Sequence, residues 1–220
     1  MKKFFVIAAM LLAGFTASAQ INIGAGYLWD FWSAKNDGSK AAGGYTLNGV
    51  YAGASYNIKL VEGLGLAPGA YFSWATGFTT NAEGKKSNPA VKADHMALTI
   101  PVHVTYTAEL GPGGFFAYLG PAFQYGLSLK NYGTTVSGDG IEINLDGDKA
   151  KATNMFKKND DGNRLNVPFD VKLGVGFGYN WKFLQANVGF DWGFLDRDAY
   201  KEDKFKQHAN AVHAGIAFVF

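Results

Sequence analysis

The stretch VPFDVKLGVGFGYNW, residues 167–181, decides the fold because apolar side chains occupy every second position along it. The positions between them hold mostly polar residues or glycine. A period of two sustained over fifteen residues predicts a β-strand with one apolar face, longer than the usual five or six residues. Residues 184–194 repeat the pattern after only Lys182 and Phe183, so the two segments are predicted to form a tight hairpin.

Six further segments alternate in the same way, which brings the predicted number of strands to eight. They cover residues 21–32, 45–59, 64–78, 94–109, 115–130 and 208–220. The connections between them are short at 60–63, 111–114 and 182–183, and long at 33–44, 79–93, 131–166 and 197–207. One end of the structure should therefore carry tight turns, and the other end long charged loops that face water.

The amino-terminal segment has the three parts of a secretory signal peptide. Lys2 and Lys3 precede an apolar run from Phe4 to Phe15, and residues 17–19, Ala-Ser-Ala, form a small-residue cleavage site. This run is about a dozen residues long, whereas a membrane-spanning helix needs about 20. We therefore expect residues 1–19 to be cleaved and residues 20–220 to form one domain. No later stretch is apolar for long enough to cross a membrane as a helix, so any insertion must use strands.

The composition excludes several classes of protein. The chain has no cysteine, which excludes disulfides, thiolate metal sites and cysteine nucleophiles. Only 17% of its residues are charged, against about 25% in a soluble domain. Removing Lys2 and Lys3 from the 20 basic residues leaves 18, equal to the 18 acidic ones, so no electrostatic argument favours nucleic acid. No cofactor is expected either.

Glycine indicates which face of the strands points outward. Fifteen glycines within the predicted strands share the polar parity, and none has the apolar parity. The interior of an eight-stranded barrel has just enough room for side chains, so small residues belong inside and large apolar ones outside. This argues against a soluble lipocalin-like barrel, and a closed barrel in lipid leaves no backbone group unpaired. Pro68 and Pro121 on the apolar face are expected at bulges or strand ends.

Tryptophan and tyrosine concentrate near the ends of the predicted strands. Trp29, Trp74 and Trp192 lie toward the loops, and Tyr56, Tyr179 and Trp181 lie toward the turns. This distribution predicts the two aromatic girdles that flank the apolar band of an outer-membrane barrel.

With these features and its final strand AGIAFVF, residues 214–220, the chain resembles the small OmpA-type and OmpX-type outer-membrane barrels of Gram-negative bacteria. The resemblance implies an all-β, eight-stranded antiparallel up-and-down transmembrane β-barrel with short periplasmic turns and long extracellular loops. It implies a monomer in the bacterial outer membrane, surrounded by lipid and lipopolysaccharide. It also implies that Ile216, Phe218 and Phe220 form the signal read by the barrel-assembly machinery.

The inward parity carries polar residues of both charges. Buried charges are tolerated only when they are paired and hydrogen-bonded, so a satisfied internal network is expected. Its predicted members are Asp30, His103, Glu109, Tyr118, Gln124, Lys130, Asp170, Lys172, Asp191 and His213. Asp170, Lys172 and Asp191 are expected to form its paired cluster. A proton or small-ion path, or a ligand pocket at the loop end, stays open as an alternative.

No catalytic or metal site is expected. His95 and His103 lie about 27 Å apart along one strand and cannot share a site, and the last strand has no serine or threonine beside His213. Runs 144–148 and 159–163 are similar to calcium-binding turns, but neither continues into the complete twelve-residue ligand loop. Plain turn chemistry explains both.

The predicted function is a structural or surface-interaction role, such as adhesion or ligand binding, through the extracellular loops. The loop at 131–166 is the candidate contact with an extracellular ligand, because irregular loops of this length are usually functional or disordered. The first alternative is a narrow channel for ions or small solutes. The second is a lipid A-modifying outer-membrane enzyme.

Overall fold

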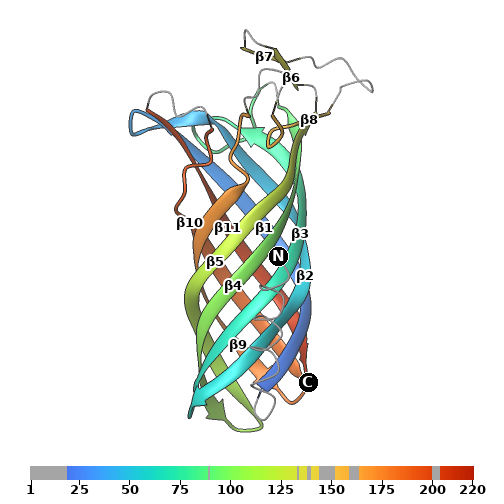
Figure 1. The fold of residues 1–220 in the computed structure, drawn as a ribbon, viewed down its shortest axis with the longest axis vertical. Helices are drawn as coiled ribbons and strands as arrows, with labels where there is room; N and C mark the ends of the chain where they lie inside the picture. The colour runs from blue at the N-terminus through green and yellow to red at the C-terminus, as the bar shows by residue number, and fades with distance from the viewer. Residues whose placement is uncertain are drawn as a thin grey trace, which may run out of the picture.

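The computed structural model describes residues 19–88, 90–132, 134–137, 140–143, 152–158, 164–199 and 204–220. Eight strands form the barrel: β1 (Ala19–Asn36), β2 (Ser39–Val61), β3 (Leu64–Thr80), β4 (Lys92–Leu110), β5 (Gly113–Tyr132), β9 (Phe169–Trp181), β10 (Leu184–Gly193) and β11 (Phe205–Val219). Each is antiparallel to its neighbours, and the pairings of β1 with β11 and of β4 with β5 close the ring (Figure 1). The eight predicted strands are confirmed.

Three short strands lie in the long connection between β5 and β9. They are β6 (Thr134–Ser137), β7 (Gly140–Ile143) and β8 (Ala152–Asn154). β6 pairs with β7, and β8 extends the edge of β5 near its end. The predicted irregular loop at 131–166 therefore contains regular structure. Most of the predicted signal peptide, residues 1–18, lies outside the described residues, so its cleavage stays a prediction.

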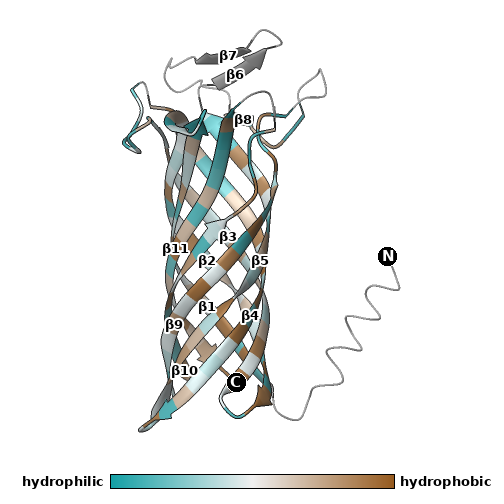
Figure 2. Ribbon diagram, turned by 90° about the vertical axis from the view of Figure 1, so that its left-hand side faces the viewer, coloured by the Kyte–Doolittle hydropathy of each residue, from teal (hydrophilic) through white to brown (hydrophobic). Residues whose placement is uncertain are grey.

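The end of the barrel with the long connections, called the loop end, is more hydrophilic than the rest of the barrel (Figure 2). The opposite end, called the turn end, has tight connections. Large apolar side chains cover the outer face between them, as at Val50, Phe72 and Phe177. Among the described residues, no helix is long and apolar enough to cross a membrane.

The connection between β1 and β2 differs from the predicted loop at 33–44. Both strands continue to the turn at Asp37 and Gly38, whose φ angles are 50° and 78°. Two positive φ angles are the mark of a type I′ turn, which matches the twist of paired strands. A bulge between Trp32 and Ala34 interrupts the pairing. The extra residues lie in β2, at 42–44, and they break the alternation of that strand.

Pro68 and Pro121 lie inside their strands, so the expectation of bulges or strand ends is wrong. The β3–β4 ladder omits two rungs after Pro68 and resumes at Tyr71 in the same register. The β5–β9 ladder continues through Pro121 without a shift. A proline removes one donor, and this barrel accepts that loss without changing register.

Glycines on the inner face make room for aromatic rings. A Cβ atom added at Gly176 would lie 2.3 Å from the Tyr118 ring, and one at Gly178 would lie 2.5 Å from the Phe116 ring. Real Cβ atoms do not approach other atoms so closely. Each of these two glycines therefore leaves the space that one particular aromatic ring occupies in the lumen.

Candidate functional site

Side chains close the barrel at the loop end. Trp32, Tyr45, Leu47 and Leu129 project from the strands and pack in one buried apolar cluster. Met155 and Phe156 enter this cluster from the β5–β9 connection, and the backbone N–H of Met155 donates to the carbonyl of Leu129 at 2.7 Å. A segment of the longest connection is therefore folded into the mouth of the barrel.

Arg197 closes the mouth from a second direction. It comes from the β10–β11 connection and is fully buried, with Nη1 3.6 Å from Oδ2 of Asp170. Its Nε donates to the carbonyl of Val167 at 2.6 Å, and its guanidinium lies over the rings of Trp32 and Phe156. Burial lowers the pKa of Arg197, whereas the Asp170 carboxylate acts in the opposite direction. Below, "the plug" means Trp32, Tyr45, Leu47, Leu129, Met155, Phe156 and Arg197.

A buried acid and histidine lie directly beneath the plug. Oδ2 of Asp30 is 2.7 Å from Nδ1 of His95, and each side chain is only 2% exposed. Trp32 donates from Nε1 to Oδ1 of Asp30 at 3.1 Å and packs edge-on against His95. Asp30 thus has the buried partners expected of it, and His95 is a member that the predicted network lacks.

The predicted pairing of Asp170 with Lys172 is wrong. Asp170 pairs with Arg197 and accepts from the backbone N–H of Leu195 at 3.2 Å. Lys172 is 1% exposed, and its Nζ has no hydrogen-bond partner within the described residues. Residues two apart on one strand face have Cα atoms about 7 Å apart, so sharing a face does not bring their charges into contact. Asp191 lies instead beside His213, with Oδ2 3.7 Å from Nε2.

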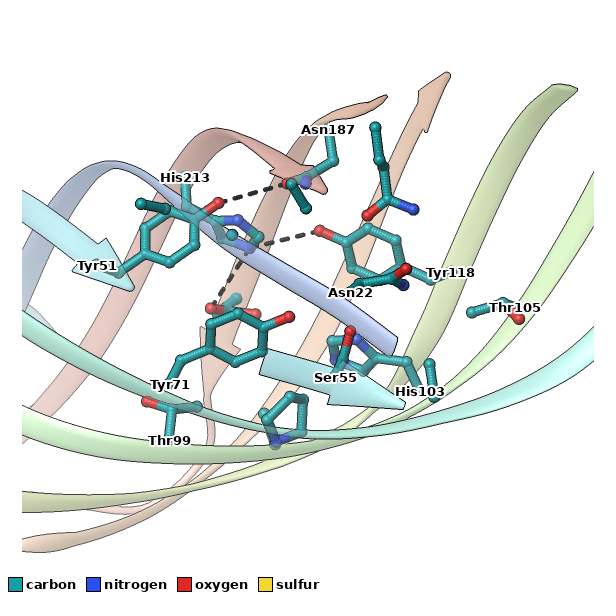
Figure 3. Close-up of a pocket in the computed structure, with 18 of the residues that line it drawn as sticks. Asn22, Tyr51, Ser55, Tyr71, Thr99, His103, Thr105, Tyr118, Asn187 and His213 are labelled. Atoms are coloured by element: carbon teal, nitrogen blue, oxygen red, sulfur yellow. Dashed lines mark hydrogen bonds and ion pairs between the residues drawn. The ribbon is translucent and has the colours of Figure 1, made fainter. Parts of the chain in front are cut away.

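A polar cavity of about 140 Å³ occupies the lumen between the plug and the turn end (Figure 3). Tyr118 is one of the residues that line it, with its hydroxyl 3.5 Å from Nε2 of His213 and its ring stacked on His103 at a centroid distance of 4.8 Å. The Tyr51 hydroxyl donates to Oδ1 of Asn187 at 3.5 Å. These contacts are long for hydrogen bonds, so the polar groups surround a space instead of filling it.

Several polar atoms on the cavity wall lack partners. Oδ1 of Asn22, Oε1 of Gln124 and Nε2 of His103 are buried and without hydrogen bonds within the described part of the chain. Buried polar atoms are usually satisfied by protein or by water, and a liquid-water molecule occupies about 30 Å³. The cavity is therefore large enough and polar enough for several water molecules.

Two predicted lumen residues lie elsewhere. Glu109 is exposed, next to the last rungs of β4 before the Gly111 turn, where the barrel no longer encloses it. Lys130 is exposed because a bulge places the extra residue Leu127 in β5, opposite the step from Met96 to Ala97. One extra residue reverses the alternation, so the side chains of residues 129 and 131 turn inward and that of Lys130 turns outward.

The predicted girdle and assembly residues have the following positions. Trp29, Trp74 and Trp192 are exposed on the loop-end half of β1, β3 and β10, Trp181 is exposed at the turn end, and Tyr56 and Tyr179 are half-buried there. Ile216, Phe218 and Phe220 are exposed along one face at the end of the chain. Their roles stay predictions.

No set of three potential ligands for a metal ion occurs among the described residues. The calcium-like runs at 144–148 and 159–163 lie outside that part of the chain. The hydroxyl found near His213 is the phenol of Tyr118, whereas acyl-transfer sites pair a histidine with a serine nucleophile.

A closed antiparallel barrel with an apolar outer surface, a polar interior and long loops at one end defines an outer-membrane β-barrel protein. The sequence matches the model of the family described as outer membrane protein beta-barrel domain over residues 11–198. The chain belongs to this family and is located in the bacterial outer membrane, in contact with its lipid and lipopolysaccharide.

Comparison with solved structures gives similar barrels at low sequence identity. Ail of Yersinia pestis, solved in complex with the heparin analogue sucrose octasulfate, is 12% identical with a TM-score of 0.47, covering 92% of this chain and 99% of Ail. OprG of Pseudomonas aeruginosa is 14% identical with a TM-score of 0.44, covering 93% and 96%. Neisserial surface protein A is 10% identical with a TM-score of 0.44, covering 91% and 96%. No curated protein matches the sequence.

Proposed function

We propose that this protein is a non-catalytic, barrel-anchored surface protein that binds a ligand through its extracellular loops and does not conduct. The observation that supports this is the plug. Phe156 and Arg197 come from two different long connections, and both are buried in the mouth of the barrel. Connections packed in the mouth in this way block the path of ions through the lumen, and they hold the outer parts of the loops above the barrel.

Hydrogen bonds fix residues 154 and 155 of the candidate binding loop to the chain on both sides of them. The N–H of Leu129 donates to Oδ1 of Asn154 at 3.2 Å, and the N–H of Asn166 donates to the carbonyl of Met155 at 3.0 Å. The β6–β7 hairpin lies beyond these contacts, at the far tip of the loop end (Figure 1). Binding residues are often carried on loops that a rigid scaffold positions. The arrangement therefore favours residues 133–151 as the contact with a ligand.

A loop replacement tests this proposal. Residues 133–151 are exchanged for a short Gly-Ser linker, which leaves Met155 and Phe156 in the plug, and binding of the purified barrel to a glycan array is measured in detergent. We expect the variant to keep the gel mobility shift between unboiled and boiled samples and to lose the saccharides that the wild type binds. The matched control replaces residues 86–88 in the β3–β4 connection. Unchanged saccharide binding after replacement of 133–151 would contradict the proposal.

A narrow channel is the second candidate, and the polar cavity favours it. Lys172, buried without a hydrogen-bond partner in the described lumen, is the residue whose charge would act most on ions passing there. Planar-bilayer recordings separate the two functions. Under our proposal the wild type and Lys172→Ala both show no unitary current, whereas a channel conducts and changes its ion selectivity when Lys172 is replaced. Mass analysis of lipid A from cells with and without the protein tests for a lipid-modifying enzyme.

A further inference from the structure

Three lysines form a row across the outer face of the barrel at the loop end. Lys35 of β1 lies directly opposite Lys40 of β2 on one side and directly opposite Lys206 of β11 on the other. All three side chains are exposed, whereas the neighbouring Ala34 is buried and points inward. Residues directly opposite on paired strands share a face. This row, called the lysine row below, spans about 10 Å because adjacent strands lie about 4.8 Å apart.

The lysine row is electrostatically unfavourable as it stands. Like charges directly opposite one another destabilise a sheet. Two carboxylates near the row in the described part of the chain are already in use, because Asp37 pairs with Lys204 at 2.8 Å and Glu83 pairs with Lys85 at 2.9 Å. No ion pair of Lys35, Lys40 or Lys206 occurs within the described residues. Three uncompensated cations on adjacent strands favour an external anion.

A groove of about 240 Å³ runs beside this row. Lys35 and Lys40 line it, together with the aromatic rings of Trp29 and Phe31, and residues 81–84 of the β3–β4 connection form another part of its wall. The bulge between Trp32 and Ala34 lies along the same groove. The site therefore combines aromatic surface near the membrane with positive charge farther out.

The height of the lysine row identifies the layer that it meets. Lys35 lies six residues beyond Trp29 on β1, which is about 20 Å along the strand. Strands of such barrels tilt by about 40°, so the row lies about 15 Å above the level of Trp29. Trp29 is exposed on the loop-end half of the barrel, where girdle residues mark the membrane interface. At this height outside the outer membrane lie the saccharide headgroups of lipopolysaccharide.

We propose that the lysine row binds a phosphate group on the saccharide headgroup of lipopolysaccharide, with the rest of the headgroup lying in the groove against Trp29 and Phe31. Ammonium groups bind phosphate as point charges, and each of the three can approach the same anion from a neighbouring strand. The site is separate from the loop at 131–166, so it does not depend on the function proposed above.

Binding of defined lipopolysaccharide to the purified full-length protein in neutral detergent tests the proposal. The triple variant Lys35→Gln, Lys40→Gln, Lys206→Gln is compared with the wild type on phosphorylated and on enzymatically dephosphorylated lipopolysaccharide. The matched control is Lys130→Gln, Lys157→Gln, Lys158→Gln, which removes the same charge from exposed lysines elsewhere at the loop end. We expect the triple variant to lose at least tenfold in affinity for the phosphorylated form only, and the control to retain wild-type affinity.

Melting without lipopolysaccharide provides a second measurement that is independent of binding. Removing the mutual repulsion of the three lysines should leave the melting temperature of the triple variant equal to or above that of the wild type, and added lipopolysaccharide should raise it less. Equal loss of affinity in both variants would overturn the proposal. So would equal binding of dephosphorylated lipopolysaccharide, of phosphatidylglycerol or of inorganic phosphate, and so would a lower melting temperature of the triple variant in detergent alone.

Discussion

The guanidinium carbon of Arg197 lies 4.6 Å from the ring centroid of Trp32, which joins the last long connection to the first strand across the barrel mouth. The contact continues inward, because Trp32 also donates to Asp30, which pairs with His95. A charge on a loop and the buried contact between Asp30 and His95 are thus linked through one indole. The plug is for this reason part of the folded barrel, and disturbing it should change stability as well as access.

Removing only Arg197 from its ion pair with Asp170 should destabilise the protein more than removing both charges. Arg197→Ala leaves the fully buried Asp170 carboxylate without its cation, which typically costs about 3–5 kcal/mol. The double variant Arg197→Ala, Asp170→Asn should recover a large part of this loss, because it removes the buried carboxylate together with its cation. Urea unfolding of all variants in detergent gives the double-mutant cycle. Strictly additive losses would show that the two side chains do not interact.

Phe156 depends on the absence of a side chain at Gly126. A Cβ atom at Gly126 would lie 2.3 Å from Cε2 of Phe156, inside the ring's own space. Gly126→Ala should therefore expel Phe156 from the plug, lower the melting temperature and give current in planar bilayers. The variant Phe156→Ala makes the decisive control. If the clash is the cause, Gly126→Ala should change the melting temperature little in that background, whereas an equal drop in both backgrounds would refute the explanation.

The bulge at Leu127 sets which residues of β5 face the lumen near the loop end. Deleting Leu127 would remove the extra residue and restore strict alternation, with Leu129 still facing the lumen and Lys130 still facing outward. Because Leu129 then stays buried in the plug, we expect the deletion to keep the heat-modifiable gel mobility of the folded barrel. Deleting Phe123 from the regular part of the β4–β5 ladder turns the buried Gln124 toward lipid and should abolish that mobility. Equal loss of the folded mobility in both deletions would show that Leu127 is required for folding and is not simply an extra residue.

The strands were predictable and the plug was not, and the reason lies in what each depends on. Every strand has one face toward lipid and one toward the lumen, so alternation such as that at residues 167–181 arises in each strand without reference to its neighbours. Arg197 lies in a connection with no periodicity, so its place over Trp32 depends on tertiary contacts alone. The partner of Asp170 is Arg197 of this connection, so the strand pattern around Asp170 could not predict it.

Bulges account for the other differences. The extra residue Leu127 has no compositional mark, so Lys130 was predicted to face inward by parity alone. The extension of β1 and β2 was available from the sequence, because Asp37-Gly38 is a strong hairpin signal. The bulge beside Ser33 concealed it by breaking the period on one side of the turn.

Phe220 offers a test that separates folding from assembly. Its side chain is 73% exposed, and the chain end is held by backbone hydrogen bonds in both directions between Phe220 and Ile21, which an alanine retains. Phe220→Ala should therefore keep the strand pairing and lower the free energy of unfolding no more than Phe177→Ala does, because both rings are exposed on the outer face. Its level in the outer membrane of cells should fall severalfold if Phe220 belongs to the assembly signal that the resemblance to small outer-membrane barrels implies. Phe177→Ala removes a ring of similar exposure, 63%, from β9 and should assemble normally. An equal fall for both variants would mean that lost apolar surface, and not recognition of the last strand, limits insertion.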